Sequence, residues 1–310
     1  MAIGKFLDPK NDFCFKRIFG TEKHCGILIH FINDVLGFSG DTAIHEVRFL
    51  KTTQDPEIAS KKQSLVDVLC RDEQGREYII EMQVARTAGF EKRAQTYATK
   101  AYSRQLESSE KYHMLKAVIF IAITDFEMFP EKPGYYSTHI VLDNSTYSHD
   151  LKDFSFTFLE LPKFNKRIDE LATGLEKWMY FFKHAETTQE EELAQIAGND
   201  IVIYEAYKAL NRFSMSDEEL NSYEQSEKRE RDAQAILDQK LLEGRAEGRA
   251  EGRAEGKAEG EAIGLAKGKA EGIDSTLSAI QLFQSGHTLE EVQRQTGLDE
   301  GVLVKLQDSL

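Results

Sequence analysis

One run without polar alternation, KAVIFIAI at residues 116–123, limits what this 310-residue chain can fold into. A strand with one solvent-facing side alternates polar and apolar residues, and this run shows no such alternation. We therefore predict a central β-strand that is covered on both faces. Because helices are the usual cover for such a strand, the run favours an α/β architecture.

The segments around this run supply the remaining elements of the predicted fold. Helical periodicity is present over residues 12–37, about 90–106 and 166–235. Short runs of β-branched or aromatic residues predict the other strands, at residues 43–50, 64–70, 77–84, 139–143 and 154–161. The pattern indicates a mixed central sheet flanked by helices, followed by an all-helical C-terminal extension.

Glycine recurs at every fourth residue from Gly244 to Gly272, mostly within EGRA or EGKA units. A period of four favours one long helix, although each glycine costs about 1 kcal/mol relative to alanine. Two interpretations stay open for residues 243–272: a helix that oligomerises through its Gly/Ala face, as in a coiled coil, or a solvated linker. The final residues predict short helices interrupted at Gly286 and Gly297. Since residues 276–310 hold two basic and five acidic side chains, we favour an interaction module over a DNA-reading helix-turn-helix.

These patterns divide the chain into four predicted parts. Residues 1–165 form the α/β domain, and residues 166–240 form a helical extension. Residues 241–274 form the glycine-rich helix or linker, and residues 275–310 form the small helical module.

Composition excludes several classes of protein. No run approaches the ~18 apolar residues of a membrane span, and the N-terminus lacks a signal peptide's apolar stretch, so we expect a cytoplasmic protein without membrane contact. Three cysteines without CxxC spacing argue against a disulfide framework or a zinc site. The eight histidines show no ligand spacing, and no phosphate-binding glycine loop is present, so no small-molecule cofactor is expected. The net charge of −14 lies almost wholly after residue 100, because residues 1–100 hold 15 basic and 14 acidic side chains.

The stretch from Ser64 to Val84 predicts a β-hairpin with chemistry at its open end. A three-residue loop ending at Gly75 sets a register in which Asp67 faces Glu81 across the ladder, with Gln83 on the same face. Two carboxylates so placed repel each other unless a cation lies between them, and an all-oxygen pair suits Mg²⁺ or Mn²⁺. The alternative is an ordinary half-exposed hairpin.

Three short motifs, taken in order, resemble one family. They are DxxFKxxFG from Asp12 to Gly20, VDV around Asp67, and EMQV with Glu81 and Gln83. Together they resemble the recombination-promoting nuclease and transposase family of bacteria, within the PD-(D/E)XK superfamily, over residues 5–165. The resemblance implies a restriction-endonuclease-like α/β fold and Mg²⁺-dependent cleavage of DNA phosphodiesters, with Mn²⁺ as a substitute, in recombination or mobile elements.

The resemblance also implies roles for individual residues. Asp67 and Glu81 would bind the metal, and Gln83, at the position of the family's lysine, would place the attacking water. A third acid from the first helix would be Asp12 or Glu22. Because glutamine is neither a cation nor a base, the rival interpretation is a catalytically inactive DNA-binding or protein-interaction module that oligomerises through residues 243–272.

The helix after the hairpin carries a second candidate feature. Arg93, Tyr97, Lys100 and Arg104 recur at i, i+4, i+7 and i+11 and therefore share one face. Three cations and a tyrosine beside a metal site would suit the phosphate backbone of DNA. The alternative is a solvated helix face with Tyr97 half in the core. The expected partners are thus DNA and further copies of the chain.

Overall fold

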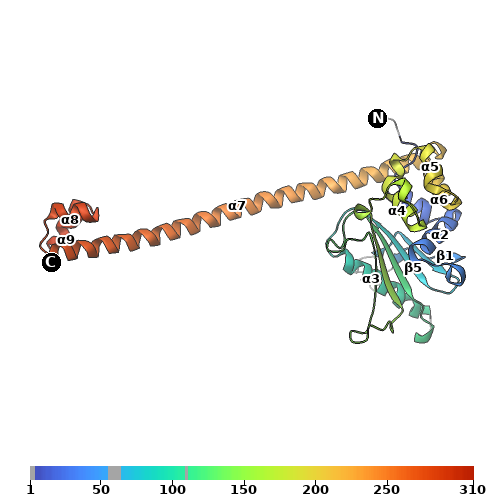
Figure 1. The fold of residues 1–310 in the computed structure, drawn as a ribbon, viewed down its shortest axis with the longest axis horizontal. Coiled ribbons are helices and arrows are strands. Elements are labelled where there is room, and N and C mark those ends of the chain that lie inside the picture. The colour runs from blue at the N-terminus through green and yellow to red at the C-terminus, as the bar shows by residue number, and fades with distance from the viewer. Residues whose placement is uncertain (1–3, 55–63, 109–110) are drawn as a thin grey trace. The chain divides into compact units, whose positions relative to one another are not determined.

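The computed structural model describes residues 4–54, 64–108 and 111–310 (Figure 1). The chain divides into two compact units, Met1–Glu230 and Arg231–Leu310. The first unit contains the sheet and most of the helices, and the second contains most of one very long helix and the C-terminal helices.

A mixed six-stranded sheet forms the centre of the first unit, in the order β1-β4-β5-β6-β8-β7. β5, β6 and β8 are parallel to one another, and the other neighbours pair antiparallel. The strands are β1 Val47–Phe49, β4 Val68–Asp72, β5 Glu77–Gln83, β6 Val118–Thr124, β7 Tyr136–Ile140 and β8 Phe154–Glu160, with a separate pair of β2 Thr53–Gln54 and β3 Ser64–Leu65.

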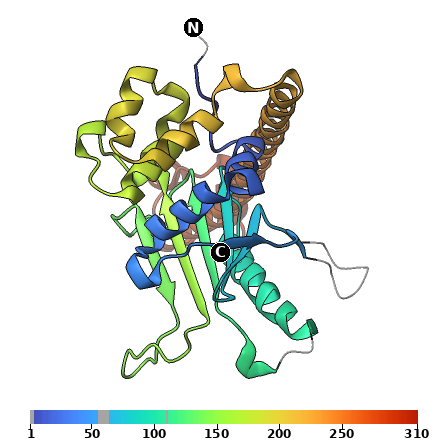
Figure 2. The same ribbon diagram turned by 90° about the vertical axis from the view of Figure 1, so that its right-hand side faces the viewer.

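Helices cover both faces of this sheet (Figures 1 and 2). α3 packs on one face, and α1, α2, α4 and α6 contribute to the core on the other. The α-helices are α1 Asp12–Phe19, α2 Cys25–Leu36, α3 Phe90–Arg104, α4 Gly174–His184, α5 Glu190–Ala197, α6 Ile201–Ala209, α7 Asp217–Gln284, α8 Leu289–Thr296 and α9 Glu300–Gln307.

The strand β6 confirms the prediction from its unbroken apolar run. Ile119, Ile121 and Ile123 belong to the aromatic-rich core beneath α1, α2 and α4. Val118, Phe120 and Ala122 belong to the core beneath α3. Alternate side chains therefore enter two separate cores, which leaves no position for a polar residue. The expected mixed sheet flanked by helices, with a helical C-terminal extension, is confirmed.

The β4–β5 hairpin adopts the predicted register. Val68 pairs with Ile80 and Cys70 with Tyr78, and Gly75 takes the left-handed φ of 85° that such a loop needs. Asp72 fixes this turn, because its carboxylate accepts hydrogen bonds from the amides of Gln74 and Arg76 and from the Tyr78 hydroxyl, at 2.9 Å each. The hairpin is thus tied at its closed end.

Three predicted strands differ from those observed. The strand expected at residues 64–70 is divided into β3 and β4, which belong to different sheets. The strand expected at residues 139–143 is β7, which begins earlier, at Tyr136, and ends at Ile140. Ile140 pairs with Ser155, so in this register Val141 would face Phe154, the first residue of β8, and residues 142–143 have no part of β8 left to pair with. The strand expected from residue 43 begins only at Val47, because the backbone of Ile44 is bonded at both ends to the Asn33 side chain, at 2.9 Å.

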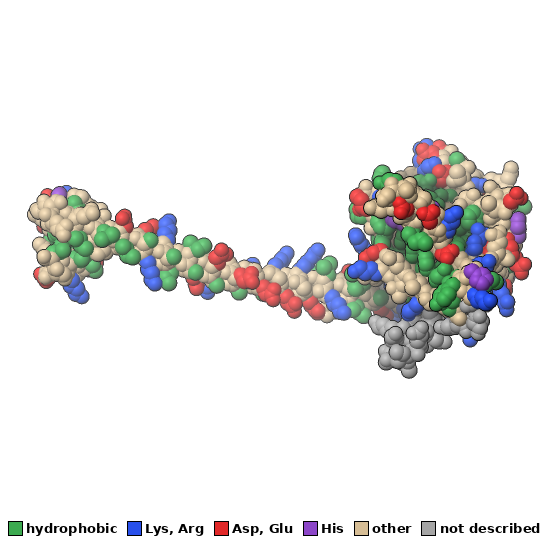
Figure 3. Space-filling model, turned by 90° about the horizontal axis from the view of Figure 1, so that it is seen from below, with side chains coloured by type: hydrophobic (Ala, Val, Ile, Leu, Met, Phe, Trp, Pro, Cys, Tyr) green, Lys and Arg blue, Asp and Glu red, His purple; other side chains and the backbone are tan. Residues whose placement is uncertain are grey.

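The glycine-rich repeat lies inside α7, one helix from Asp217 to Gln284. Ser216 and Glu219 form a capping box at its start. At each glycine from Gly244 to Gly272 nothing lies within 4 Å of where a Cβ would be, and charged side chains of both signs line the helix (Figure 3). None of the described helices combines the length and apolar character needed to cross a bilayer.

The end of α7 packs with α8 and α9 around a small core of Ala279, Val292 and Leu303. Gly286 and Gly297 both have left-handed φ values, 85° and 67°. The predicted breaks at these glycines are therefore confirmed. The first of the predicted short helices is instead the final part of α7.

Candidate active site

Asp67 and Glu81 meet at the open end of the β4–β5 hairpin, where the first strand is interrupted just before Val68. Each carboxylate accepts a hydrogen bond from the backbone of the opposite chain segment. The Asp67 amide donates to Glu81 Oε1 at 3.2 Å, and the Met82 amide donates to Asp67 Oδ2 at 3.0 Å. These bonds leave Asp67 Oδ1 and Glu81 Oε2 as the oxygens not used by the two amides.

Burial makes this pair of acids electrostatically unfavourable. Glu81 is 5% exposed, and burial, together with the charge of Asp67, raises its pKa to about 8. Burial also raises the pKa of Asp67, against the lowering effect of the Met82 amide and Lys16. Both carboxylates therefore hold protons more tightly than they would in water, as acids with too little nearby positive charge do.

Helix α1 places a lysine and a third acid beside this pair. Lys16 Nζ lies 3.9 Å from Asp67 Oδ1 and also forms an ion pair with Asp12, one turn earlier. Asp12 is close enough to raise the pKa of Asp67. Of the two first-helix acids considered, Asp12 is thus beside the pair, whereas Glu22 follows the opposite end of α1.

Lys16 was part of the DxxFKxxFG motif but was not predicted as a site residue. The available signal was its i,i+4 spacing from Asp12, which places both side chains on one side of α1. No signal in the sequence predicted the docking of α1 against the open end of the hairpin. That docking depends on the aromatic core of Phe15, Phe19 and Phe182.

Gln83 lies two residues beyond Glu81 on the same strand, and its amide is held at both ends. Its Oε1 accepts from Arg93 of α3, and its Nε2 donates to the Ala85 carbonyl at 2.7 Å. A glutamine amide has two N–H groups and two lone pairs on oxygen. These two bonds therefore leave one N–H group and one oxygen lone pair of Gln83 available for further hydrogen bonds.

The four residues predicted on one face of α3 do share it, since Arg93, Tyr97, Lys100 and Arg104 are all half-buried. The structure brings only part of this row to the acids. The charge of Arg93 lowers the pKa values of Asp67 and Glu81, and burial next to Glu81 raises that of Tyr97. Arg104 lies near the other end of β5, where its Nη2 is 3.6 Å from Glu77 Oε2.

A second acidic group, not predicted from the sequence, surrounds His30 of α2. Asp34 Oδ2 lies 3.1 Å from His30 Nδ1, and Asp200 Oδ1 lies 3.4 Å from Nε2. Trp178 donates to Asp34 at 2.9 Å, and Lys177 Nζ lies 3.9 Å from Asp200. Burial opposes the charged imidazolium, but the two aspartates outweigh it and raise the pKa of His30. The arrangement is that of an ion-pair network linking α2 to the start of α6.

The donors around Asp67 and Glu81 fit a divalent cation better than the His30 group does. They are carboxylate oxygens, the ligands that Mg²⁺ and Mn²⁺ prefer. Each acid has one oxygen oriented by a backbone amide and a second outside those bonds. Burial and the charge of Asp67 raise the pKa of Glu81 despite the opposing charges of Arg93 and Lys16, and a metal ion would supply further positive charge.

Comparison with known proteins gives one match. The family model for PD-(D/E)XK nuclease family transposases matches residues 9–240. No curated protein and no solved structure matches the chain. The match extends from the approach to α1, through the acidic hairpin and all of the sheet, into the first part of α7. By this match, which spans well over half of its length, the chain belongs to the PD-(D/E)XK nuclease family transposases.

Proposed function

We propose that the protein is a metal-dependent DNA endonuclease that hydrolyses phosphodiester bonds in the context of recombination or mobile elements. The observation that carries the proposal is the carboxylate pair of Asp67 and Glu81, which reciprocal backbone hydrogen bonds hold together and whose pKa values burial raises. Such a pair is costly to keep in a fold unless a cation uses it. Family membership supports DNA as the substrate.

In this proposal Asp67 and Glu81 hold Mg²⁺, or Mn²⁺ in its place. The bound metal would acidify a water molecule and offset negative charge on the phosphate. Gln83 orients the attacking water through the donor and acceptor that Ala85 and Arg93 leave available. Asp12 keeps Lys16 in position through their ion pair.

The cations of the site bind the substrate phosphate and take over the charge of the lysine that Gln83 replaces. Lys16 lies on the α1 side of the acids and Arg93 on the α3 side. Charge-assisted hydrogen bonds from such groups position a phosphate without reading its base. We propose further phosphate contacts for Tyr97, Lys100 and Arg104, with Arg104 the most distant from the acids along β5.

Plasmid cleavage by the full chain tests this proposal, with Mg²⁺, Mn²⁺, Ca²⁺ or EDTA and with Asp67→Ala and Glu81→Ala alongside. We expect metal-dependent nicking by the parent protein and none by either variant. Equal cleavage by parent and variants would remove these acids from the mechanism. Metal binding and DNA binding without cleavage in any metal would favour the alternative, a DNA-binding module that has lost catalysis.

We also propose that the chain forms homo-oligomers through α7. The glycine positions leave one side of the repeat open to close approach, and exposed apolar side chains such as Leu241, Leu242, Ile263 and Leu265 occur before and within it. Sedimentation equilibrium should give a multiple of the 35.3 kDa chain mass. The Leu241→Asp/Leu242→Asp variant should shift toward a monomer, and a monomeric parent protein would contradict the proposal.

A further inference from the structure

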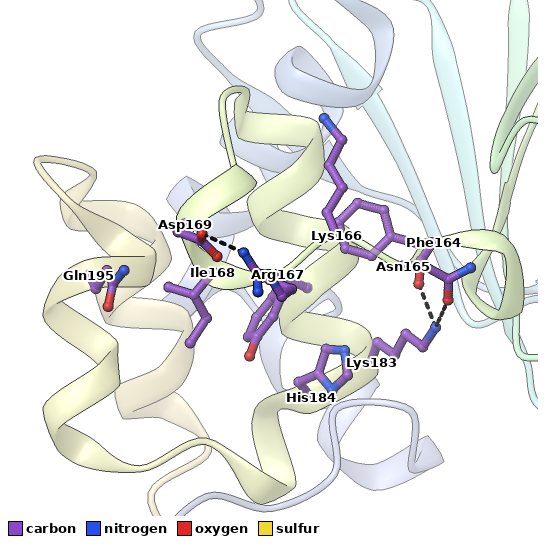
Figure 4. A pocket seen from close by; sticks show the side chains of 10 residues that line it. Phe164, Asn165, Lys166, Arg167, Ile168, Asp169, Lys183, His184 and Gln195 are labelled. Atoms are coloured by element: carbon purple, nitrogen blue, oxygen red, sulfur yellow. Dashed lines mark hydrogen bonds and ion pairs between the residues drawn. The ribbon is translucent and has the colours of Figure 1, made fainter.

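An open pocket of about 560 Å³ lies between the segment that follows β8 and the end of α4. Among the charged side chains of its walls, cations outnumber acids. Lys166, Arg167 and Lys183 line it together with His184, against one carboxylate, that of Asp169. Figure 4 shows Lys183 and His184 on one wall, with Arg167 and Asp169 joined across from them. This composition suits an anion.

Lys183 is the cation of this pocket with unused charge. Lys166 is ion-paired with Glu176, and Arg167 with Asp169. Lys183 Nζ donates instead to two neutral oxygens, the Phe164 carbonyl and Asn165 Oδ1, and forms no salt bridge with the part of the chain that the structure describes. Burial and the neighbouring charge of Lys10 lower its pKa. An anionic group would therefore supply a charge partner that the fold itself does not provide.

The pocket lies beyond the carboxyl ends of the parallel strands, which is also the end of the sheet that carries the acidic pair. Gln83, Thr124 and Glu160 form one row across the parallel strands β5, β6 and β8. The chain leaves β5 at the proposed active site and leaves β8 four residues before Phe164, the first residue of the pocket wall. Neighbouring strands are about 4.8 Å apart, so β5 and β8 are separated by about 10 Å.

The stretch between the two sites carries both acids and cations. Asp125 follows β6, and Lys10 Nζ lies 2.9 Å from its carboxylate and 3.9 Å from that of Asp8. Lys10 also lies close enough to Lys183 and His184 to lower their pKa values, together with burial. Glu186 also lies near Asp8 and Lys10, so a nucleic-acid strand that crosses this stretch would meet carboxylates that Lys10 offsets in part.

We propose that this pocket is a second phosphate subsite, which binds a backbone phosphate of the DNA strand whose scissile phosphate lies at Asp67 and Glu81. The inference rests on the proposed nuclease function and extends it. Lys183 and Arg167 bind the remote phosphate and so position the strand at the acids.

The test uses the full chain and fluorescently labelled single-stranded DNA of 16 or 2 nucleotides, bound in Ca²⁺ at several salt concentrations. The variant Arg167→Gln/Lys183→Gln is compared with Lys208→Gln/Lys228→Gln, which removes two exposed cations elsewhere. We expect the pocket variant to bind the 16-mer about tenfold more weakly, with the salt slope reduced by about 0.7 per lost phosphate contact. The control variant and all dinucleotide affinities should not change, and Arg167→Lys/Lys183→Arg should restore 16-mer binding.

A second readout separates this subsite from catalysis. Acetylation of Lys183 by an N-hydroxysuccinimide ester, followed by peptide mass spectrometry, should be blocked by the 16-mer in the parent protein and in Glu81→Gln alike. Protection in a parent that never cleaves DNA would overturn the proposed function and leave the subsite standing. Cleavage with Lys183 fully reactive, or protection by deoxyadenosine monophosphate or inorganic phosphate but not by DNA, would overturn the subsite.

Discussion

The two ends of the β4–β5 hairpin each hold a pair of partly or fully buried acids, yet they differ in how the charge is compensated. At the closed end, Asp72 binds Arg76 at 2.6 Å and Glu77 binds Arg71 at 2.6 Å. At the open end, Asp67 and Glu81 face each other, and among the residues that the structure describes their ion-pair contact is Lys16, 3.9 Å from Asp67.

This difference teaches how to distinguish an acid that holds a fold together from one that is available for chemistry. Burial alone does not separate them, since Glu77 and Glu81 are both almost inaccessible, at 0% and 5% exposed. Compensation does. Burial and Asp67 raise the pKa of Glu81 to about 8, whereas Glu77 has arginines on two sides. The following predictions test this contrast, beginning with the largest expected effect.

Glu77→Gln and Glu81→Gln form a matched pair, because both residues lie on the same face of β5. Glu81→Gln should reduce cleavage about a thousandfold, the equivalent of several kcal/mol of lost metal-assisted stabilisation. It should leave the metal-free protein as stable as the parent or more so, since a repulsion disappears. Glu77→Gln should cost about 3 kcal/mol of unfolding free energy, because it leaves Arg71 and Arg104 unpaired, with cleavage per folded molecule retained. Plasmid nicking measures cleavage, and urea denaturation measures the unfolding free energy. The same result for both variants would contradict the proposed difference between the two acids.

A bound metal ion should stabilise the fold only through Asp67 and Glu81, at the open end of the hairpin. Mn²⁺ at a hundred times its Kd should add about 2.7 kcal/mol to the unfolding free energy. Thermal melts with Mn²⁺ or EDTA should show this gain in the parent and in Glu77→Gln, and no gain in Glu81→Gln. A gain that survives Glu81→Gln but is lost in Asp34→Asn would transfer the metal site to the His30 group.

The metal-free protein should lose stability as the pH rises. Because the folded-state pKa of Glu81 is raised from 4.5 to about 8, the folded state binds this proton more tightly than the unfolded chain does. The resulting stability is complete below about pH 4.5 and is lost progressively toward pH 8. Melting temperatures in EDTA should fall over this range in the parent and fall less in Glu81→Gln. Parallel curves for the two proteins would contradict the raised pKa.

Arg71→Gln should have the smallest effect. The Arg71 side chain is 43% exposed, so solvent screens its attraction to Glu77, and Arg104 still faces the same carboxylate. We expect a loss of about 1 kcal/mol or less, measured by urea denaturation, and unchanged cleavage. A loss as large as that of Glu77→Gln would mean that Arg104 does not share the compensation.

Local sequence signals were sufficient for the hairpin and the central strand. Gly75 fixed the loop length, and the loop length fixed which residue faces Glu81. The unbroken apolar run of β6 predicted a core on each face of the strand, and both cores are present. These predictions succeeded because turn geometry and strand periodicity depend on residues that are adjacent in the chain.

Predictions failed where the answer depended on the docking of distant segments. Lys16 reaches Asp67 because the aromatic residues of α1 pack against α4 within the core that also covers one face of the sheet. Arg104 shares a helix face with Arg93, but α3 runs along β5 and places the two arginines at different acids. His30 and Asp200 are 170 residues apart and meet through the packing of α2 against α6. No period or motif in the sequence carries such information.

The reciprocal bonds between Asp67 and Glu81 have a consequence for how the site could be observed. The amides of Asp67 and Met82 are capped by carboxylate oxygens instead of strand carbonyls, so the last rungs of this ladder are made by the acids themselves. Their protection against hydrogen–deuterium exchange therefore depends on the charge state and occupancy of the acids. The exchange rates of these two backbone amides should therefore report what the carboxylates bind, without any turnover of substrate.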